Sequence, residues 1–137
     1  MTLAFVDTGA WIALMVPRDG HHRQAREFFR DVATVARLLT SNYVLAETVT
    51  WLAYHGLRHR AVQLREMVTA AAAMRRLEIV WATPEIDAEA WDYYQRLDSR
   101  ELSFCDCASF AISHSRSVDY VFGFDTDFRI AGLELRP

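Results

Sequence analysis

Leu3-Ala4-Phe5-Val6-Asp7-Thr8, close to the start of the chain, is the most informative stretch of the sequence. Residues 3 to 6 are all apolar, which predicts a strand covered on both faces, as in the interior of a parallel sheet. A residue directly after such a strand lies at its carboxyl end, where open α/β sheets bind their ligands. We therefore expect Asp7 to belong to a site, with the alternative that Asp7 and Thr8 cap a short helix starting at Ala10.

Strand-like and helix-like segments alternate along the rest of the chain. Strands are expected at residues 3–6, 38–40, 77–81, 119–122 and 133–135, and helices at 10–16, 21–37, 42–55, 59–74, 84–97 and 103–114, with a short helical turn in 124–128. This alternation predicts an α/β fold with a mostly parallel central sheet of four to five strands flanked by helices on both faces. Because no repeat or linker is visible, residues 1–137 are expected to form a single domain.

Composition excludes several kinds of chemistry. All 15 basic residues are arginine, so the chain lacks the lysine of a phosphate-binding P-loop, of a Schiff-base enzyme and of a receiver domain. Cys105 and Cys107 are two positions apart on an expected helix, where they point in different directions and cannot form a disulfide. The net charge of −3 argues against a nucleic-acid-binding protein, unless bound metal neutralises some of the acids.

The beginning of the chain runs directly into the first expected strand. Residues 1 to 6 contain no charged leader, long apolar run or small-residue cleavage site. We therefore expect a cytoplasmic protein without a membrane-spanning segment.

Three further acids are expected at the same edge of the sheet as Asp7. Glu47 lies on the second turn of the helix that follows the second strand, and Asp106 on the first turn of the last long helix. Asp125 follows the fourth strand closely, and Asp127 is near enough to join the group. Carboxylates from separate segments would repel one another unless a cation lay between them. Oxygen donors without an accompanying His or Cys favour Mg²⁺, with Mn²⁺ as the alternative and either one or two ions.

Each of these acids also has a purely structural interpretation. Ser103 and Asp106 match the capping box that stabilises a helix N-terminus. Glu47 borders the apolar face of its helix and could simply be solvated. Residues 125 to 127 could form a turn, since Asp favours turns. The functional interpretation therefore depends on the acids meeting at one place.

The acids belong to four short motifs whose order and spacing are informative together. The motifs are Phe5-Val6-Asp7-Thr8-Gly9-Ala10, Ser41-Asn42-Tyr43-Val44-Leu45-Ala46-Glu47-Thr48, Leu102-Ser103-Phe104-Cys105-Asp106 and Phe124-Asp125-Thr126-Asp127-Phe128. With them the chain resembles, over essentially its whole length, the PIN-domain ribonucleases, and most closely the VapC toxins of type II VapBC toxin–antitoxin systems. The resemblance implies a PIN-like three-layer fold, a VapB-like antitoxin as partner and association into homodimers.

The resemblance also assigns roles to individual residues. The family's acidic residues are matched by Asp7, Glu47, Asp106 and Asp125. It implies that Asp7 and Asp106 bind the metal directly, and that the other two acids complete the site directly or through water. Asp127 is expected to be auxiliary, and Thr8 to orient Asp7 or a bound water.

Two positions depart from the family pattern. Gly9 stands where a Ser is frequent, and Gly123 stands where a Thr or Ser often precedes the fourth acid by two residues. The missing hydroxyl at Gly123 is expected to weaken the support of Asp125, so that cleavage is weaker or depends more on the metal supplied.

These expectations combine into one hypothesis: the chain is a Mg²⁺-dependent endoribonuclease and the toxin of a toxin–antitoxin pair. Water activated by the metal attacks the phosphorus in line, and the metal offsets the charge on the non-bridging oxygens. Such a reaction leaves a 5′-phosphate, whereas a 2′,3′-cyclic phosphate would contradict it. The alternatives are a PIN nuclease of RNA processing without an antitoxin, and a catalytically inactive PIN binding domain. The RNA target stays open, because loops are recognised by surface shape and stacking.

Three arginines provide a candidate surface for the RNA substrate. Arg23, Arg26 and Arg30 share one face of an expected helix by their spacing. Arginine suits phosphate recognition through its forked donors, so this face is expected to bind RNA. The alternative is a solvated face with local ion pairs, such as that of Arg23 with Glu27.

Overall fold

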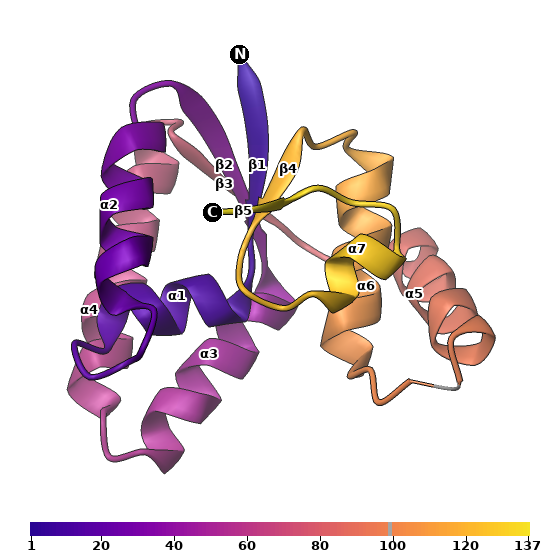
Figure 1. Ribbon diagram of the computed structural model, residues 1–137, viewed down its shortest axis with the longest axis horizontal. Coiled ribbons are helices and arrows are strands. Elements are labelled where there is room, and N and C mark those ends of the chain that lie inside the picture. Colours follow the sequence, from indigo (N-terminus) through magenta and orange to yellow (C-terminus); the bar gives the residue numbers. More distant parts are fainter. Residues whose placement is uncertain (99) are drawn as a thin grey trace.

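The chain is built on a parallel β-sheet, and the computed structural model describes residues 1–98 and 100–137 (Figure 1). The strands are β1 Thr2–Val6, β2 Ala36–Ser41, β3 Leu77–Val80, β4 Tyr120–Phe122 and β5 Leu135–Arg136. The helices are α1 Thr8–Met15, α2 His22–Val32, α3 Asn42–Tyr54, α4 Arg58–Ala73, α5 Pro84–Arg96, α6 Phe104–Ser115 and α7 Asp127–Ile130. Within the described residues, five strands form one sheet in the order β3-β2-β1-β4-β5, and all neighbours run parallel. The predicted α/β class is therefore confirmed.

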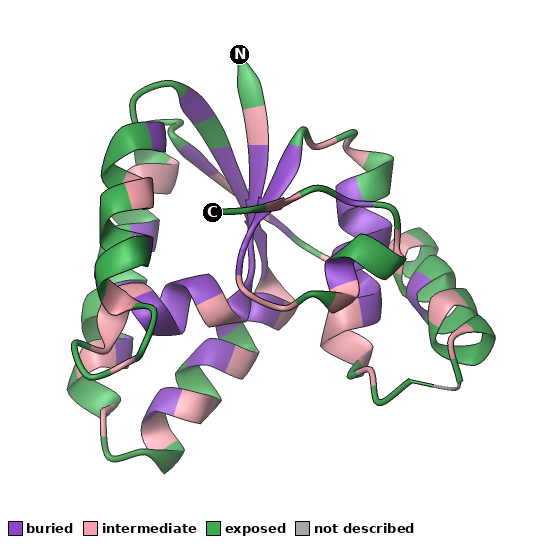
Figure 2. Cartoon of the chain, in the orientation of Figure 1, coloured by how far each residue is buried: buried purple, intermediate pink, exposed green. Residues whose placement is uncertain are grey.

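Helices cover both faces of this sheet and give the fold its three layers. In Figure 1, α2 and α4 lie on one side of the strands, and α5 and α6 lie on the other. Figure 2 shows that buried residues gather on the strands, on α1 and on the inner face of α6. The outward faces of α2, α4 and α5 are mostly exposed, as expected for helices that bury one side against a sheet.

The sheet has β1 at its centre because this strand offers no polar face to water. Ala4, Phe5 and Val6 are completely buried. β1 pairs with β2 on one side, where Phe5 lies opposite Leu39, and with β4 on the other, where Val6 lies opposite Phe122. The carboxyl ends of these strands therefore meet at one edge of the sheet, and the residues that follow β1 and β4 lie side by side there.

The helix expected over residues 21–37 is wrong at its C-terminal end. α2 ends at Val32, and β2 begins at Ala36 rather than at residue 38. Val35, which continues the apolar spacing of the helix, is 62% exposed in the connecting turn. Residues 36–41 pair with β1 and β3 in the sheet, and this long-range pairing outweighs the helical periodicity.

The last strand also lies later than the expected 133–135. β5 is Leu135–Arg136, because α7 and a turn at Gly132 come before it. Gly132 has a φ of 79°, a left-handed conformation that suits glycine. Leu133 is instead buried in the apolar core.

The longest helix that the structure describes is α4, with 16 residues. In residues 1–98 and 100–137, no helix is both long and apolar enough to span a membrane.

A buried polar link holds the carboxyl ends of β1 and β2 to α1. The indole N–H of Trp11 donates a hydrogen bond to the Thr40 hydroxyl at 3.1 Å. That hydroxyl in turn donates to the carbonyl of Val6, also at 3.1 Å. Both side chains are almost fully buried, so each polar group depends on the other for a partner.

We expect Thr40→Val to lower the free energy of unfolding by about 1–3 kcal/mol. The valine keeps the shape of the side chain but leaves the Trp11 N–H without an acceptor. Urea unfolding measures the effect, with Thr34→Val, at an exposed threonine, as the matched control. Equal stability of the two variants would contradict the importance of this link.

Candidate active site

Asp7 follows β1 directly and is buried at the carboxyl edge of the sheet. Its backbone N–H donates to the carbonyl of Phe122 at 3.0 Å, which ties the start of α1 to β4. The residue occupies the N-cap position of α1, yet its side chain makes no capping hydrogen bond. Asp7 is only 4% exposed, and its Oδ1 has no hydrogen-bond partner. The side-chain cap considered from the sequence is therefore wrong, and a buried carboxylate oxygen is left for another partner.

The electrostatics of Asp7 connect it to the other three acids. The pKa of Asp7 is raised to about 7, chiefly by burial; the backbone N–H of Thr8 lowers it, and the charges of Asp106, Glu47 and Asp125 raise it. Acids from three other segments of the chain thus act on one carboxyl group. The structure brings them within electrostatic reach of one another, as the sequence led us to expect.

Asp106 has both of the roles that the sequence suggested. Its Oδ2 accepts the backbone N–H of Ser103 at 3.0 Å, while the Ser103 hydroxyl accepts the backbone N–H of Asp106 at 3.0 Å. The capping box of α6 is therefore confirmed. Burial raises the pKa of Asp106, the hydrogen bonds to Ser103 lower it, and the charges of Asp125 and Glu47 raise it again. The capping box uses Oδ2, so Oδ1 can still serve a ligand.

Glu47 lies on α3 and Asp125 lies between β4 and α7, and the charges of both act on Asp7 and Asp106. Glu47 lies on the second turn of α3, and the Ser41 hydroxyl fixes the start of that helix by accepting the N–H of Val44 at 3.1 Å. Asp125 forms the turn considered from the sequence, because its Oδ1 accepts the backbone N–H of Asp127 at 2.9 Å. Asp127, the first residue of α7, therefore lies beside Asp125, and its auxiliary role stays a prediction.

Thr8 places a second unpaired oxygen next to Asp7. The residue is 8% exposed, and its Oγ1 has no hydrogen-bond partner. A buried hydroxyl without a partner is unfavourable and commonly marks a place for an ordered water or an ion. The expectation that Thr8 orients Asp7 or a water is compatible with this position.

Cys105 belongs to the same group, although the sequence analysis considered it only for disulfides. Burial raises the pKa of its thiol well above the usual range, and the charges of Glu47, Asp7 and Asp106 raise it further. A hydrogen bond between Cys105 and Glu47 acts in the same direction. The sequence feature that could have identified Cys105 is its position one residue before Asp106, on the first turn of α6.

The oxygen donors fit a hard divalent cation. A divalent cation would offset the repulsion among these carboxylates. It would also give a partner to the two buried oxygens that have none, Asp7 Oδ1 and Thr8 Oγ1. Among the residues that the structure describes, no three His, Cys, Asp or Glu side chains close around a single point as a ready-made cage. Mg²⁺ typically binds through one or two carboxylates and keeps several waters, so a complete cage is not required.

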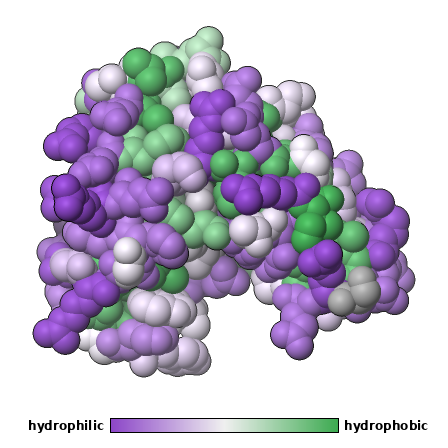
Figure 3. All heavy atoms as spheres, viewed as in Figure 1, coloured by the Kyte–Doolittle hydropathy of each residue, from purple (hydrophilic) through white to green (hydrophobic). Residues whose placement is uncertain are grey.

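The surface is indented between two of the helices that carry these acids. Figure 3 shows an indentation at the lower edge of the molecule, between α3 and α6, the helices that carry Glu47 and Asp106. The same view shows hydrophilic residues gathered over α2.

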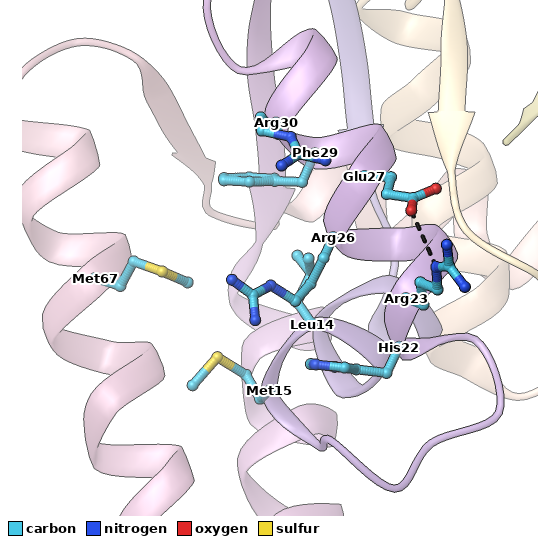
Figure 4. Close-up of a pocket in the computed structure, with 9 residues that line it drawn as sticks. All are labelled: Leu14, Met15, His22, Arg23, Arg26, Glu27, Phe29, Arg30 and Met67. Carbon is cyan, nitrogen blue, oxygen red and sulfur yellow. Dashed lines mark hydrogen bonds and ion pairs between the residues drawn. The ribbon is translucent and has the colours of Figure 1, made fainter.

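The three arginines of α2 lie at a different place. Arg23, Arg26 and Arg30 line a cavity of about 500 Å³, and none of the four acids lines it. The other lining residues are Leu14, Met15, His22, Glu27, Phe29 and Met67. In Figure 4, Arg26 extends toward the two methionines, whereas Arg23 turns to Glu27, with which it forms the ion pair considered from the sequence, at 3.1 Å.

The burial of Asp7 predicts how the stability of the metal-free protein depends on pH. The folded protein holds a proton that the unfolded chain releases near pH 3.8, so this stabilisation is complete below that pH and is lost as the pH rises through about 7. Asp7→Asn resembles the protonated side chain, so we expect it to be more stable than the wild type above pH 7, by on the order of 3 kcal/mol. Urea unfolding in EDTA at pH 5 and pH 8 measures the difference, with Asp31→Asn as an exposed control. An unchanged difference between the two pH values would contradict this account.

Comparisons with known proteins agree with this fold. The PIN domain family matches residues 4–133. The 23S rRNA-specific endonuclease VapC20 of Mycobacterium tuberculosis is 37% identical over 139 residues, which cover 98% of this chain and 99% of the relative. The crystal structure of the same organism's VapC20, described as a sarcin–ricin loop cleaving toxin, superposes with a TM-score of 0.80 at 34% identity, over 98% of this chain and 99% of that one.

More distant structures share the fold alone. VapBC2 from Rickettsia felis, bound to a promoter DNA fragment, gives a TM-score of 0.73 at 13% identity over 98% of each chain. DNA-bound VapBC from Salmonella typhimurium gives 0.69 at 18% identity over 99% of this chain and 98% of that one. From the match over residues 4–133 and the full-length identity to VapC20, the chain belongs to the PIN-domain ribonucleases and, within them, to the VapC family of type II toxin–antitoxin systems.

Proposed function

We propose that this protein is a Mg²⁺-dependent endoribonuclease, the toxin of a type II toxin–antitoxin pair, and that residues 1–137 act in the cytoplasm as one PIN domain. One observation carries the proposal. Asp7 is buried at the carboxyl edge of the sheet with an unpaired carboxylate oxygen, and three acids from other segments act on its charge. Membership of the VapC family supports the same reaction.

The roles of the acids follow from what each oxygen already contacts. Asp7 and Asp106 would hold the ion directly. Oδ1 of Asp7 has no hydrogen-bond partner, and Oδ1 of Asp106 is free of the capping box, which uses Oδ2. Glu47 and Asp125 would complete the site directly or through water. A bound Mg²⁺, or Mn²⁺ in its place, supplies an activated water and offsets the charge that develops on the phosphodiester. Thr8 can hold a water beside Asp7 through its unpaired hydroxyl.

The substrate proposed for this chain is 23S ribosomal RNA. VapC20 carries that specificity in its name, and its sequence aligns with this chain from end to end at 37% identity. Conserved length and fold make a related RNA loop the simplest substrate, with the product ending in a 5′-phosphate.

A VapB-like antitoxin is the proposed protein partner, and the cavity on α2 is its proposed binding site. Met15, Phe29 and Met67 give this cavity an apolar part of its lining, and Arg26 and Arg30 give it positive charge. A lining that is partly apolar and partly cationic suits an amphipathic peptide segment that carries acids. The apolar lining favours such a segment over RNA as the occupant, so RNA binding at Arg23, Arg26 and Arg30 takes second place.

Self-association into a homodimer is also proposed. Large apolar side chains are exposed in the free chain, among them Tyr54, Trp81, Trp91 and Tyr94. Aromatic residues are enriched at protein interfaces, where burial from water stabilises association.

We expect Asp7→Asn to lower the rate of 23S rRNA cleavage in Mg²⁺ by about 100-fold or more, because loss of a ligand exceeds the 10- to 100-fold effect of losing an outer partner. Asp31→Asn, which removes an exposed carboxylate on α2, should cleave like the wild type. Mapping of RNA ends measures both the rate and the chemistry, and EDTA should abolish cleavage by all three proteins. Equal cleavage by Asp7→Asn, or a 2′,3′-cyclic phosphate product, would overturn the proposed reaction.

We expect Arg26→Glu to weaken binding of the cognate antitoxin by about tenfold or more, since a like charge would face the acids of the bound segment. Arg75→Glu, at an exposed arginine after α4, changes the net charge by the same amount as Arg26→Glu and is the matched control. Isothermal titration of the purified toxin with its antitoxin measures both affinities. Unchanged binding by Arg26→Glu would place the antitoxin elsewhere.

A further inference from the structure

Two aromatic side chains are stacked on the surface of α5. The rings of Trp91 and Tyr94 lie 5.3 Å apart between centroids, and their planes are inclined by only 8°. Trp91 is 53% exposed and Tyr94 is 45% exposed. Large apolar groups that are exposed side by side, rather than scattered singly, commonly mark a binding surface.

The packing of α5 against α6, which lie side by side in Figure 1, uses a different face of the helix. Ala90 is completely buried, and Tyr93 meets Phe110 of α6 edge to face, with 5.8 Å between the ring centroids. Successive residues of a helix are rotated by about 100°. Trp91 and Tyr94, each one position further along, therefore lie beside the packed face rather than in it.

Aromatic contacts connect this stack with the two helices that border the surface indentation. The ring of Phe104, the first residue of α6, lies 6.0 Å from that of Trp91 and 6.4 Å from that of Tyr94. Phe104 also meets Tyr43 of α3 edge to face, with 5.9 Å between the ring centroids. Tyr43, Phe104, Trp91 and Tyr94 thus form an aromatic row that runs from α3 across the start of α6 to α5.

The inner end of the aromatic row lies close to the acids. Tyr43 comes four residues before Glu47 on α3, a spacing that places both on the same face of the helix. Phe104 comes two residues before Asp106, on the first turn of α6. An RNA whose scissile phosphate lies at the acids can therefore reach the aromatic row with a neighbouring nucleotide.

The charges on α5 decide which part of an RNA can lie there. The helix carries four exposed acids, Glu85, Asp87, Glu89 and Asp92. Their carboxylates repel phosphate groups, whereas an uncharged nucleobase can stack on an aromatic face. Single-stranded loops of RNA offer unstacked bases for such a contact.

We propose that Trp91 and Tyr94 bind an unpaired nucleobase of the RNA substrate by stacking, at a nucleotide close to the scissile phosphate. Phe104 and Tyr43 connect this base site with the acids. The inference rests on the proposed function, since it takes the substrate to be RNA that is cleaved at the acids.

A second copy of the chain is the rival occupant of this surface, because exposed aromatic groups also suit an interface between proteins. The continuity of the aromatic row with the helices of Glu47 and Asp106 favours the base. A homodimer can bury other exposed aromatic groups, such as Tyr54 and Trp81.

The test measures kcat and KM in Mg²⁺ on a short 23S rRNA hairpin that contains the cleavage site mapped with the wild type. We expect Trp91→Leu to raise KM by about tenfold, as the loss of one stacked base predicts, and to change kcat little. Trp91→Phe keeps an aromatic face and should restore most of the affinity. Val35→Ala is the control for loss of exposed apolar surface, because Val35 is 62% exposed before β2, at the opposite edge of the sheet from the acids.

Hairpins with a single abasic nucleotide on either side of the cleavage site identify the base. One of them should raise the KM of the wild type as much as Trp91→Leu does on the intact hairpin. On that abasic hairpin, Trp91→Leu should cause no further loss, because the partner of the side chain is already gone. Equal losses from Trp91→Leu on the intact hairpin and on both abasic hairpins would overturn the base site.

The outcomes separate the inference from the proposed function. A wild type that leaves the hairpin uncut would overturn both, whereas cleavage by the wild type with an unchanged KM in Trp91→Leu would overturn the inference alone. Sedimentation of the free proteins tests the rival: a wild-type dimer that Trp91→Leu dissociates, with KM unchanged, would assign this surface to a second copy. If Trp91→Leu does not fold, Tyr94→Leu takes its place under the same criteria.

Discussion

The burial of one negative charge at the end of a central strand is the constraint on which the rest of this structure depends. β1 must lie between β2 and β4 to cover its apolar residues, and this places Asp7 where water has little access. Glu47, Asp106 and Asp125 then add their own negative charge to the same place. A proton relieves this repulsion in the metal-free protein, and a divalent cation would relieve it more fully. A proton and a divalent cation would therefore compete for the carboxylate of Asp7.

Structural and functional interpretations of the acids turn out to be compatible. Asp106 completes the capping box of α6, and Asp125 closes the turn before α7. Each of these contacts uses one carboxylate oxygen and holds the side chain in place, which leaves the second oxygen for a ligand. Local hydrogen bonds thus fix the direction of side chains whose charges act on Asp7, so that little ordering remains to be done when an ion binds.

The candidate active site and the candidate partner surface lie in different parts of the structure. The acids lie at the carboxyl edge of the sheet, whereas the arginines of α2 line a cavity with methionine and phenylalanine side chains. A net charge of −3 is thus compatible with a local basic surface, because Arg23, Arg26 and Arg30 line one cavity and none of the four acids lines it. The net charge of such a molecule is a poor guide to the partners that it binds, and the distribution of charge over its elements is a better one.

The sequence by itself determined the class of the fold and the strand at residues 3–6 that is covered on both faces, and it predicted which acids would meet, because apolar runs and helix caps are local signals. It misjudged residues 33–37: helical spacing continues past Val32, but residues 33–35 form a turn, and residues 36 and 37 pair with β1 as the start of β2. Only the tertiary structure placed Cys105 against Glu47, Gly123 against Asp7 and the arginines of α2 around an apolar cavity. These are contacts between segments far apart in the chain, or choices of which face a helix buries, and their energies depend on packing that no local pattern records.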